Sequence, residues 1–204
     1  MKVLLLNGSP HEKGCIFTSL SEIAATLQKE GIDSEIFWIG NKPVQGCNAC
    51  GQCSGGRGCV FKDELYNAFT EKMNSADAII IGAPVYYAGP PGPLCAILDR
   101  TFYSAARLFR HKPGACVVNC RRGGASSTFD RLNKYFTLLQ MPVVSSQYWN
   151  STHGTKPEDV KQDLEGLQTM RTLARNTAHM LNSMKNADIP LPEPEPHLST
   201  NFIR

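Results

Sequence analysis

Four cysteines crowd into one short stretch of the sequence. Cys47, Cys50, Cys53 and Cys59 follow the pattern C-x2-C-x2-C-x5-C, and glycines precede the last of them. Thiolates at such compact spacing can surround an iron–sulfur cubane, because the glycines let the chain turn back and supply the fourth ligand. Structural zinc sites usually draw on two separated pairs of ligands and fit this run less well. The segment is therefore a candidate metal site.

The first part of the chain contains a candidate anion site. Residues 2–6 form an aliphatic run, residues 7–14 are mostly turn formers, and apolar residues recur at helical spacing over residues 16–27. A buried strand that leads through a Gly/Ser loop into a helix brings unpaired backbone N–H groups and the helix dipole to one point, which attracts a phosphate. The loop matches neither Walker A nor Gly-x-Gly-x-x-Gly. An ordinary strand-to-helix turn is the alternative.

Alternating apolar runs and helical patterns predict the scaffold that positions both candidate sites. Strands that alternate with helices form a parallel sheet covered on both faces. The sequence thus predicts an α/β protein with a doubly wound, five-stranded parallel sheet of order 2-1-3-4-5, the flavodoxin-like arrangement. We expect strands at residues 2–6, 34–39, 77–82, 114–119 and 142–148, and helices at 16–27, 63–73, 93–110, 128–140 and 156–184.

In this topology three loops meet at the carboxyl edge of the sheet, where ligands bind at the switch between the first and third strands. They follow strands one, three and four and span residues 9–18, 84–89 and 119–124. A phosphate turn, a tyrosine pair and a Gly-rich basic turn together suit a phosphorylated aromatic ligand such as FMN. The candidate binding residues are Ser9, His11, Cys15, Ile16, Phe17, Thr18, Pro84, Val85, Tyr86, Tyr87, Asn119, Arg121, Arg122, Gly123 and Gly124.

Each loop also has a simpler explanation. The hydroxyls of Ser9 and Thr18, with the amides of residues 11–18, would hold the phosphate, but Ser and Thr also cap helices. Tyrosine pairs more often pack than bind ligands, although this pair follows a strand and lies beside Pro and Gly. Arg121 and Arg122 could meet flavin, a nicotinamide phosphate or solvent.

Length and composition limit the possible partners. The 204 residues carry 21 Lys plus Arg against 18 Asp plus Glu, a formal charge of +3 that is too mild to indicate nucleic acid or membrane. No apolar stretch approaches the ~20 residues of a membrane span. The sequence opens on a strand rather than a signal peptide, so we expect a cytoplasmic protein with reduced cysteines.

The organisation expected from these patterns is simple. Residues 1–185 should form a single flavodoxin-like, FMN-binding domain, into which the cysteine-rich loop 46–60 is inserted after the second strand. Residues 186–204 are rich in proline and should form an extended C-terminal tail, because alternating prolines cannot continue a helix.

Several motifs together resemble the NADPH-dependent FMN reductase family and its close relatives, the iron–sulfur flavoproteins. They are Asn7-Gly8-Ser9-Pro10, the cysteine run, Lys62-Asp63-Glu64, residues 76–86 and Leu98-Asp99-Arg100. The resemblance covers roughly residues 1–150 and implies a flavodoxin-like fold, noncovalent FMN, and a homodimer or dimer of dimers. Three positions depart from the family pattern: His11 stands where members usually carry Arg, and Cys15 and Ile16 stand where they carry Asn and Thr.

The resemblance implies an NAD(P)H oxidoreductase that works by ping-pong hydride transfer. NAD(P)H would reduce FMN, and the electrons would pass to a quinone, a flavin, a nitro or azo compound or a similar acceptor, with no catalytic side chain required. The alternative is an iron–sulfur flavoprotein, in which a [4Fe–4S] cluster on the four cysteines exchanges electrons with FMN. Without a cluster, the cysteine loop would cover the flavin and the dimer interface, reduced or partly disulfide-bonded. A flavodoxin-type electron carrier fits less well, because such carriers tend to be acidic.

Overall fold

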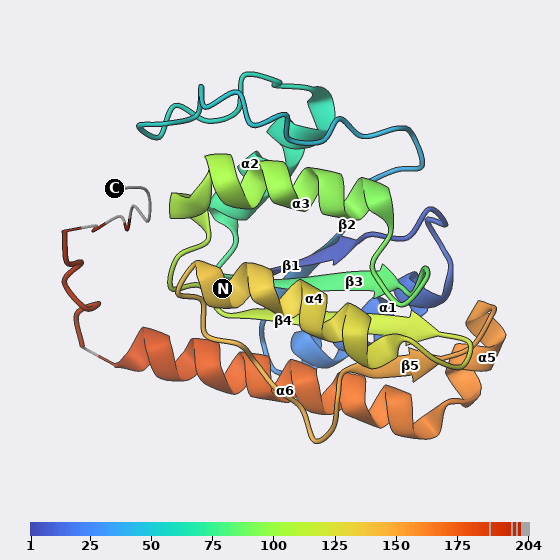
Figure 1. Ribbon diagram of the computed structural model, residues 1–204. Helices are drawn as coiled ribbons and strands as arrows, with labels where there is room; N and C mark the ends of the chain where they lie inside the picture. Colours follow the sequence, from blue (N-terminus) through green and yellow to red (C-terminus); the bar gives the residue numbers. More distant parts are fainter. Residues whose placement is uncertain (188, 197, 199, 201–204) are drawn as a thin grey trace.

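A five-stranded parallel sheet forms the centre of the molecule (Figure 1). In this computed structural model, which describes residues 1–187, 189–196, 198 and 200, the strand order is β2-β1-β3-β4-β5 and every strand pair is parallel. The predicted flavodoxin-like sheet is therefore confirmed. The strands are β1 (Lys2–Asn7), β2 (Asp33–Trp38), β3 (Ala78–Pro84), β4 (Gly114–Cys120) and β5 (Ser151–His153).

Side chains that alternate along the central strands build two hydrophobic cores. On β1, Leu4 and Leu6 point into one core, while Val3 and Leu5 point into the other. This follows from the two-residue period of a strand, which sends successive side chains to opposite faces. Because both faces of β1, β3 and β4 are buried, their sequences read as continuous apolar runs rather than as alternating ones.

Helices cover both faces of the sheet, as predicted (Figure 1). Two of them pack on the core that contains Val3 and Leu5, and three pack on the opposite core. The first group is α1 (Cys15–Lys29) and α6 (Leu164–Asn186); the second is α2 (Glu64–Ser75), α3 (Gly92–Ser104) and α4 (Ala125–Leu138), and a short α5 (Pro157–Gln162) precedes α6.

Two predicted helices differ from those observed, one in length and one in continuity. The helix expected at 93–110 ends at Ser104 and is followed by a single 3-10 turn, Ala106–Leu108. The helix expected at 156–184 is divided at Asp163, whose backbone leaves the helical region and whose carboxylate accepts a hydrogen bond of 2.9 Å from the amide of Gly166. An aspartate in this position caps a new helix, so Asp163 starts α6 instead of continuing α5.

The predicted position of the fifth strand was wrong. Of residues 142–148, only Val143 forms a bridge to β4, at Gly114, and the chain then leaves the sheet. It returns as β5, where Ser151–His153 pair with Val118–Cys120. At the break, the side-chain amide of Asn150 donates to the carbonyl of Cys116 (3.1 Å) and replaces a ladder hydrogen bond. The apolar run therefore starts the edge strand, and a polar segment further along completes it.

The cysteine segment and the C-terminal tail lie outside the regular elements. Residues 39–63 contain no helix or strand and lie next to α2 and α3 at the top of Figure 1. Of the predicted tail 186–204, Asn186 ends α6, residues 187, 189–196, 198 and 200 are in no helix or strand, and the rest lies outside the described residues.

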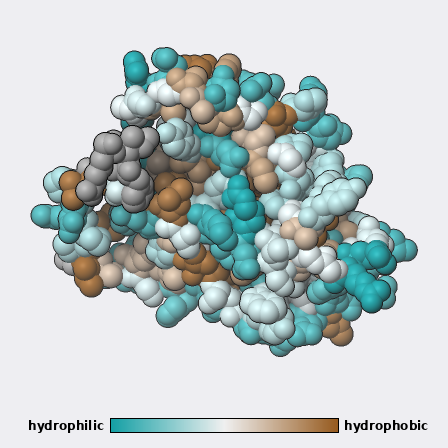
Figure 2. Space-filling view, in the orientation of Figure 1, coloured by the Kyte–Doolittle hydropathy of each residue, from teal (hydrophilic) through white to brown (hydrophobic). Residues whose placement is uncertain are grey.

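In the part of the chain described, no helix combines the length and apolar character of a membrane span. Figure 2 shows hydrophobic residues scattered among hydrophilic ones on one face.

Candidate functional site

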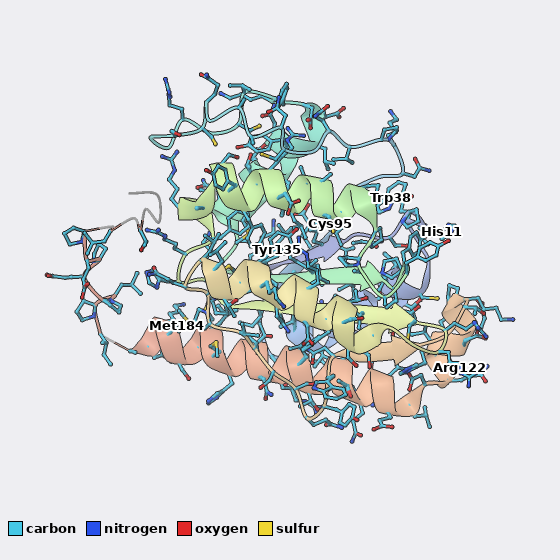
Figure 3. The ribbon with its side chains drawn as sticks, in the orientation of Figure 1. His11, Trp38, Cys95, Arg122, Tyr135 and Met184 are labelled. Atoms are coloured by element: carbon cyan, nitrogen blue, oxygen red, sulfur yellow. The ribbon has the colours of Figure 1, made fainter. Side chains whose placement is uncertain are left out.

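A cavity of about 620 Å³ lies at the carboxyl edge of the sheet, within the size range of small-molecule sites. The loops after β1 and β3 contribute to it, but of the loop expected at residues 119–124 only Asn119 lines the cavity, and Asn119 lies inside β4. Figure 3 shows His11 and Trp38 together at this edge and Arg122 further along it. Predicted residues that line the cavity are Ser9, His11, Cys15, Ile16, Pro84, Tyr86 and Asn119; those that do not are Phe17, Thr18, Val85, Tyr87, Arg121, Arg122, Gly123 and Gly124.

Sequence reasoning missed part of the cavity wall. Trp38 and Asn41 come from the end of β2, and Gly154, Thr155 and Lys156 follow β5. The indole Nε1 of Trp38 donates to the carbonyl of Ser9 (2.8 Å), which joins β2 to the turn after β1. Since β2 is the neighbour of β1, the strand order itself was the signal that could have brought Trp38 to this edge.

The turn after β1 is held in shape by its own polar groups. The buried side chain of Asn7 accepts from the amide of Ser9 (3.1 Å) and donates to the carbonyl of Glu12 (2.9 Å). Ser9 Oγ accepts from the amide of His11 (3.1 Å). Gly8 is required because a Cβ there would lie 2.9 Å from the carbonyl oxygen of Gly82. Contacts within the protein therefore hold the turn in this form.

The start of α1 presents unpaired donors to this cavity. Its first hydrogen bond within the helix runs from the amide of Thr18 to the carbonyl of Gly14 (3.1 Å), so the amides of residues 15–17 have no acceptor among the described residues. No side chain caps this end and no acidic residue lies in the first turn. Lys13 and Lys156 also line the cavity. Free amides, the helix dipole and two cations together favour an anion.

Two polar side chains of α1 take different roles. The hydroxyl of Thr18 donates to the carbonyl of Gly14 (3.2 Å) and does not reach the cavity wall. The thiol of Cys15 lies 3.9 Å from the carbonyl oxygen of Gly154, and burial raises its pKa. Cys15 therefore enters this site as a neutral thiol and adds no negative charge next to the helix start.

A tight turn holds the tyrosine pair at the mouth of the cavity. Tyr86 and Gly89 exchange both backbone hydrogen bonds (2.8 and 3.0 Å), while Tyr87 and Ala88 have φ values of +49° and +57°. This is a type I′ turn without glycine at its central positions, which is strained. The hydroxyl of Ser127 at the start of α4 donates to the carbonyl of Ala88 (2.8 Å). The turn leaves Tyr86 half-exposed and Tyr87 fully exposed.

The four clustered cysteines surround one small cavity. Cys47, Cys50, Cys53 and Cys59 all line a space of about 30 Å³, together with Arg100 from α3. All eight cysteines of the chain are free. Among the described residues, no three side chains of the ligand types are grouped closely enough to hold one metal ion. The four thiols are the donor set of an iron–sulfur cluster, but the space admits roughly one water molecule, so the loop must open to receive a cluster.

Arg100 is the charged residue that lines this cavity together with the cysteines. Its side chain is 0 % exposed and its Nη1 donates to the carboxylate of Asp63 (2.6 Å). Burial lowers the pKa of Arg100, but Asp63 and Cys59 raise it by more, so the guanidinium stays charged. Its Nε is buried and has no hydrogen-bond partner within the described part of the chain. A buried donor without an acceptor is rare and calls for an explanation.

Comparisons with known proteins identify the family of this chain. The model of the NADPH-dependent FMN reductase family matches residues 1–156. An iron–sulfur flavoprotein of Methanocaldococcus jannaschii is 30% identical over 195 residues, which cover 91% of this chain and 100% of the relative. An iron–sulfur flavoprotein of Methanosarcina thermophila is 31% identical over 196 residues, 92% of this chain and 100% of the relative.

Solved structures share the fold at much lower identity. RosB, with a bound 8-demethyl-8-formylriboflavin-5′-phosphate, aligns with a TM-score of 0.73 at 14% identity, covering 100% of this chain and 94% of RosB. FerB, an NAD(P)H:acceptor oxidoreductase of Paracoccus denitrificans, aligns with a TM-score of 0.65 at 15% identity, covering 89% of this chain and 97% of FerB. With the family model spanning three of the loops at the carboxyl edge, the chain belongs to the NADPH-dependent FMN reductase family and is similar to its iron–sulfur flavoprotein relatives.

Proposed function

We propose that this protein is an FMN-dependent NAD(P)H oxidoreductase that reduces a quinone, flavin, nitro or azo compound or a similar acceptor by ping-pong hydride transfer. The observation that carries the proposal is the cavity at the carboxyl edge, where the uncapped start of α1 faces the same space as Tyr86 and Asn119. Membership of the FMN reductase family supports it. FMN, when bound, supplies the hydride chemistry.

The side chains and amides of the cavity would bind and orient the cofactor. The amides of residues 15–17, Ser9 and Lys13 would hold the phosphate, because they combine free donors with positive charge. Tyr86 would flank the ring and, with Trp38, exclude water from one side of it. Arg121 and Arg122, which are exposed and lie outside the cavity wall, would contact the nicotinamide cosubstrate or a partner subunit. We further propose a homodimer or dimer of dimers.

A second function is favoured by the cysteine segment. We propose that Cys47, Cys50, Cys53 and Cys59 bind a [4Fe–4S] cluster, since all four line one cavity and the curated relatives are named iron–sulfur flavoproteins. The loop would then join the flavin site to a one-electron partner. The two functions are compatible, because the cysteines and the phosphate turn lie in different segments of the chain.

The experiment that tests both functions starts from anaerobically purified protein. We expect flavin absorption, one FMN per chain in a fluorescence-quench titration, and parallel lines in a two-substrate analysis with NADPH or NADH and a quinone. An apoprotein that binds no FMN would refute the oxidoreductase. Iron and sulfide assays test the cluster independently, and about four of each per chain are expected.

Two single cysteine substitutions, one inside the cysteine run and one outside it, provide the test and its matched control. Cys53→Ser should remove the iron while FMN and quinone reduction persist, because three other loops hold the flavin. Cys95→Ser changes a free, half-buried cysteine of α3 outside the cysteine run and should leave iron and FMN unchanged. Equal iron content in both variants would contradict the cluster, and loss of FMN in the Cys53 variant alone would place the cysteine loop in the flavin site.

A further inference from the structure

One buried arginine joins the two ends of the cysteine loop. Nη1 of Arg100 donates to the carbonyl of Gln45 (3.0 Å), directly before the loop, and Nη2 donates to the carbonyl of Phe61, directly after it. Nη1 also binds Asp63, and the guanidinium lies 5.2 Å from the centre of the Tyr66 ring. A single side chain of α3 therefore fixes both ends of a segment that has no helix or strand of its own.

The guanidinium of Arg100 has one N–H donor that the loop ends and Asp63 do not use. Four of its five N–H donors belong to the two Nη atoms that hold the loop ends and Asp63, but the Nε donor is buried without a partner among the described residues. Arg100 also lines the cavity that the four cysteines surround. A buried cation with a free donor suits a neighbour that carries negative charge and accepts hydrogen bonds, which four thiolates around an iron–sulfur centre supply.

We propose that Arg100 is a positioning and tuning residue for the iron–sulfur cluster: it closes the cysteine loop around the metal and stabilises the reduced cluster with its charge and its Nε–H. This rests on the iron–sulfur function proposed above. Reduction adds one electron, taken from reduced FMN, and so adds one negative charge beside Arg100 without making or breaking a bond. A nearby fixed cation favours that step, because cluster potentials respond to net charge and to hydrogen bonds at sulfur.

The test is a reductive titration of the cluster with dithionite, followed by electron paramagnetic resonance, on anaerobically reconstituted protein. Arg100→Gln removes the charge, and we expect at least a tenfold shift of the one-electron equilibrium toward the oxidised cluster, about 59 mV to lower potential. Arg107→Gln is the matched control, because it removes an exposed arginine near the same loop and should shift the equilibrium less than twofold. Iron and FMN per chain are measured for each variant.

Two further variants keep the test decisive if Arg100→Gln does not fold. Arg100→Lys retains the charge but not the planar fork, so it should lower iron retention at least twofold while shifting the equilibrium less than Arg100→Gln does. Asp63→Asn leaves the guanidinium charge uncompensated and should shift the equilibrium in the opposite direction, toward the reduced cluster. If Arg100 only held the loop in place, Arg100→Gln and Asp63→Asn would not be expected to shift the redox equilibrium of the cluster in opposite directions.

The outcomes separate this proposal from the function on which it rests. If the wild-type protein takes up neither iron nor sulfide, the iron–sulfur function is refuted, and the role of Arg100 with it. If the wild-type protein loads a cluster and neither Arg100→Gln nor Asp63→Asn shifts the equilibrium more than Arg107→Gln, only the role of Arg100 is overturned. A loaded wild type with shifts of opposite sign supports both.

Discussion

Gly124 supports the strained tyrosine turn, and replacing it by alanine tests how this turn is held. Gly124 precedes α4 with φ +87°, a left-handed conformation that side chains rarely adopt. A Cβ at this position would lie 2.9 Å from the Cα of Ala88 and 2.9 Å from Cγ1 of Val85. Since Ala88 is a central residue of the turn, Gly124→Ala must either strain the backbone or displace the turn.

The expected cost follows from these two contacts. A non-glycine residue in the left-handed region costs about 1–2 kcal/mol, and forcing an extra methyl group into a packed contact adds about 1–3 kcal/mol. Part of the second amount relaxes if the turn moves, so we expect the free energy of unfolding to fall by about 2–4 kcal/mol. In a chain of this size that corresponds to a loss of roughly 4–16 °C in the melting temperature.

The neighbouring glycine is the matched control. Gly123 has no positive φ and a Cβ there would meet nothing within 4 Å, so Gly123→Ala should change the free energy of unfolding by no more than about 0.5 kcal/mol. Urea unfolding of the apoproteins measures both. Equal stabilities for Gly124→Ala and Gly123→Ala would refute the steric argument. A fluorescence-quench titration then measures whether displacement of the turn weakens FMN binding tenfold or more, about 1.4 kcal/mol. If Gly124→Ala is destabilised but its FMN affinity is unchanged, the tyrosine turn is not part of the flavin site.

Four further substitutions test other contacts. Trp38→Phe removes the donor to the carbonyl of Ser9 and should lower the free energy of unfolding by about 1 kcal/mol in urea titrations; no loss would mean that the indole does not join β2 to the turn. Ser9→Ala should weaken FMN binding by about 1–3 kcal/mol and riboflavin binding much less. Thr18→Ala should change neither affinity, because the hydroxyl of Thr18 donates within α1. Equal losses of FMN and riboflavin affinity in Ser9→Ala would mean that the phosphate binds elsewhere. Asp63→Asn keeps the cap of α2 but removes the charge beside Arg100, and should lower the free energy of unfolding by about 1–2 kcal/mol at neutral pH. This loss is smaller than that expected for a fully buried ion pair, because the side chain of Asp63 is 43 % exposed. Burial raises the pKa of Asp63, but the amide of Tyr66 and the charge of Arg100 lower it by more, so the pKa of Asp63 in the folded protein is lowered. The ion pair therefore stabilises the fold at pH values above the ordinary aspartate pKa of about 3.9, and this stabilisation is lost as the pH falls through the pKa of Asp63 in the folded protein. The stability difference between wild type and Asp63→Asn should shrink in acid, and a difference that grows would contradict the ion pair.

Local sequence patterns were sufficient for the central strands of the scaffold. The runs at residues 2–6, 77–82 and 114–119 lie on strands that are buried on both faces, and burial on both faces is what makes such runs continuously apolar. The loops after these strands then had to meet at one edge, because all strands of the sheet are parallel. The four cysteines also lie around one cavity, since they are close together in a single loop.

Long-range packing decided what the sequence left open. The edge strand β5 contains Ser151–His153 rather than the apolar run at 142–148, because a strand at the edge needs hydrogen-bond partners on one side only and can be interrupted where Asn150 takes over a ladder bond. Trp38 joined the cavity because β2 packs beside β1.

The sequence by itself determined the central strands, the polar turn after β1 and the set of four cysteines, because each is marked by residue types that lie close together in the chain. The tertiary structure alone placed Arg100 between Gln45, 55 positions earlier, and Phe61, 39 positions earlier. No periodicity encodes a contact of that kind, since it depends on how α3 packs beneath an irregular loop. The charge next to the cysteines is therefore a property of the folded protein and not of the motif.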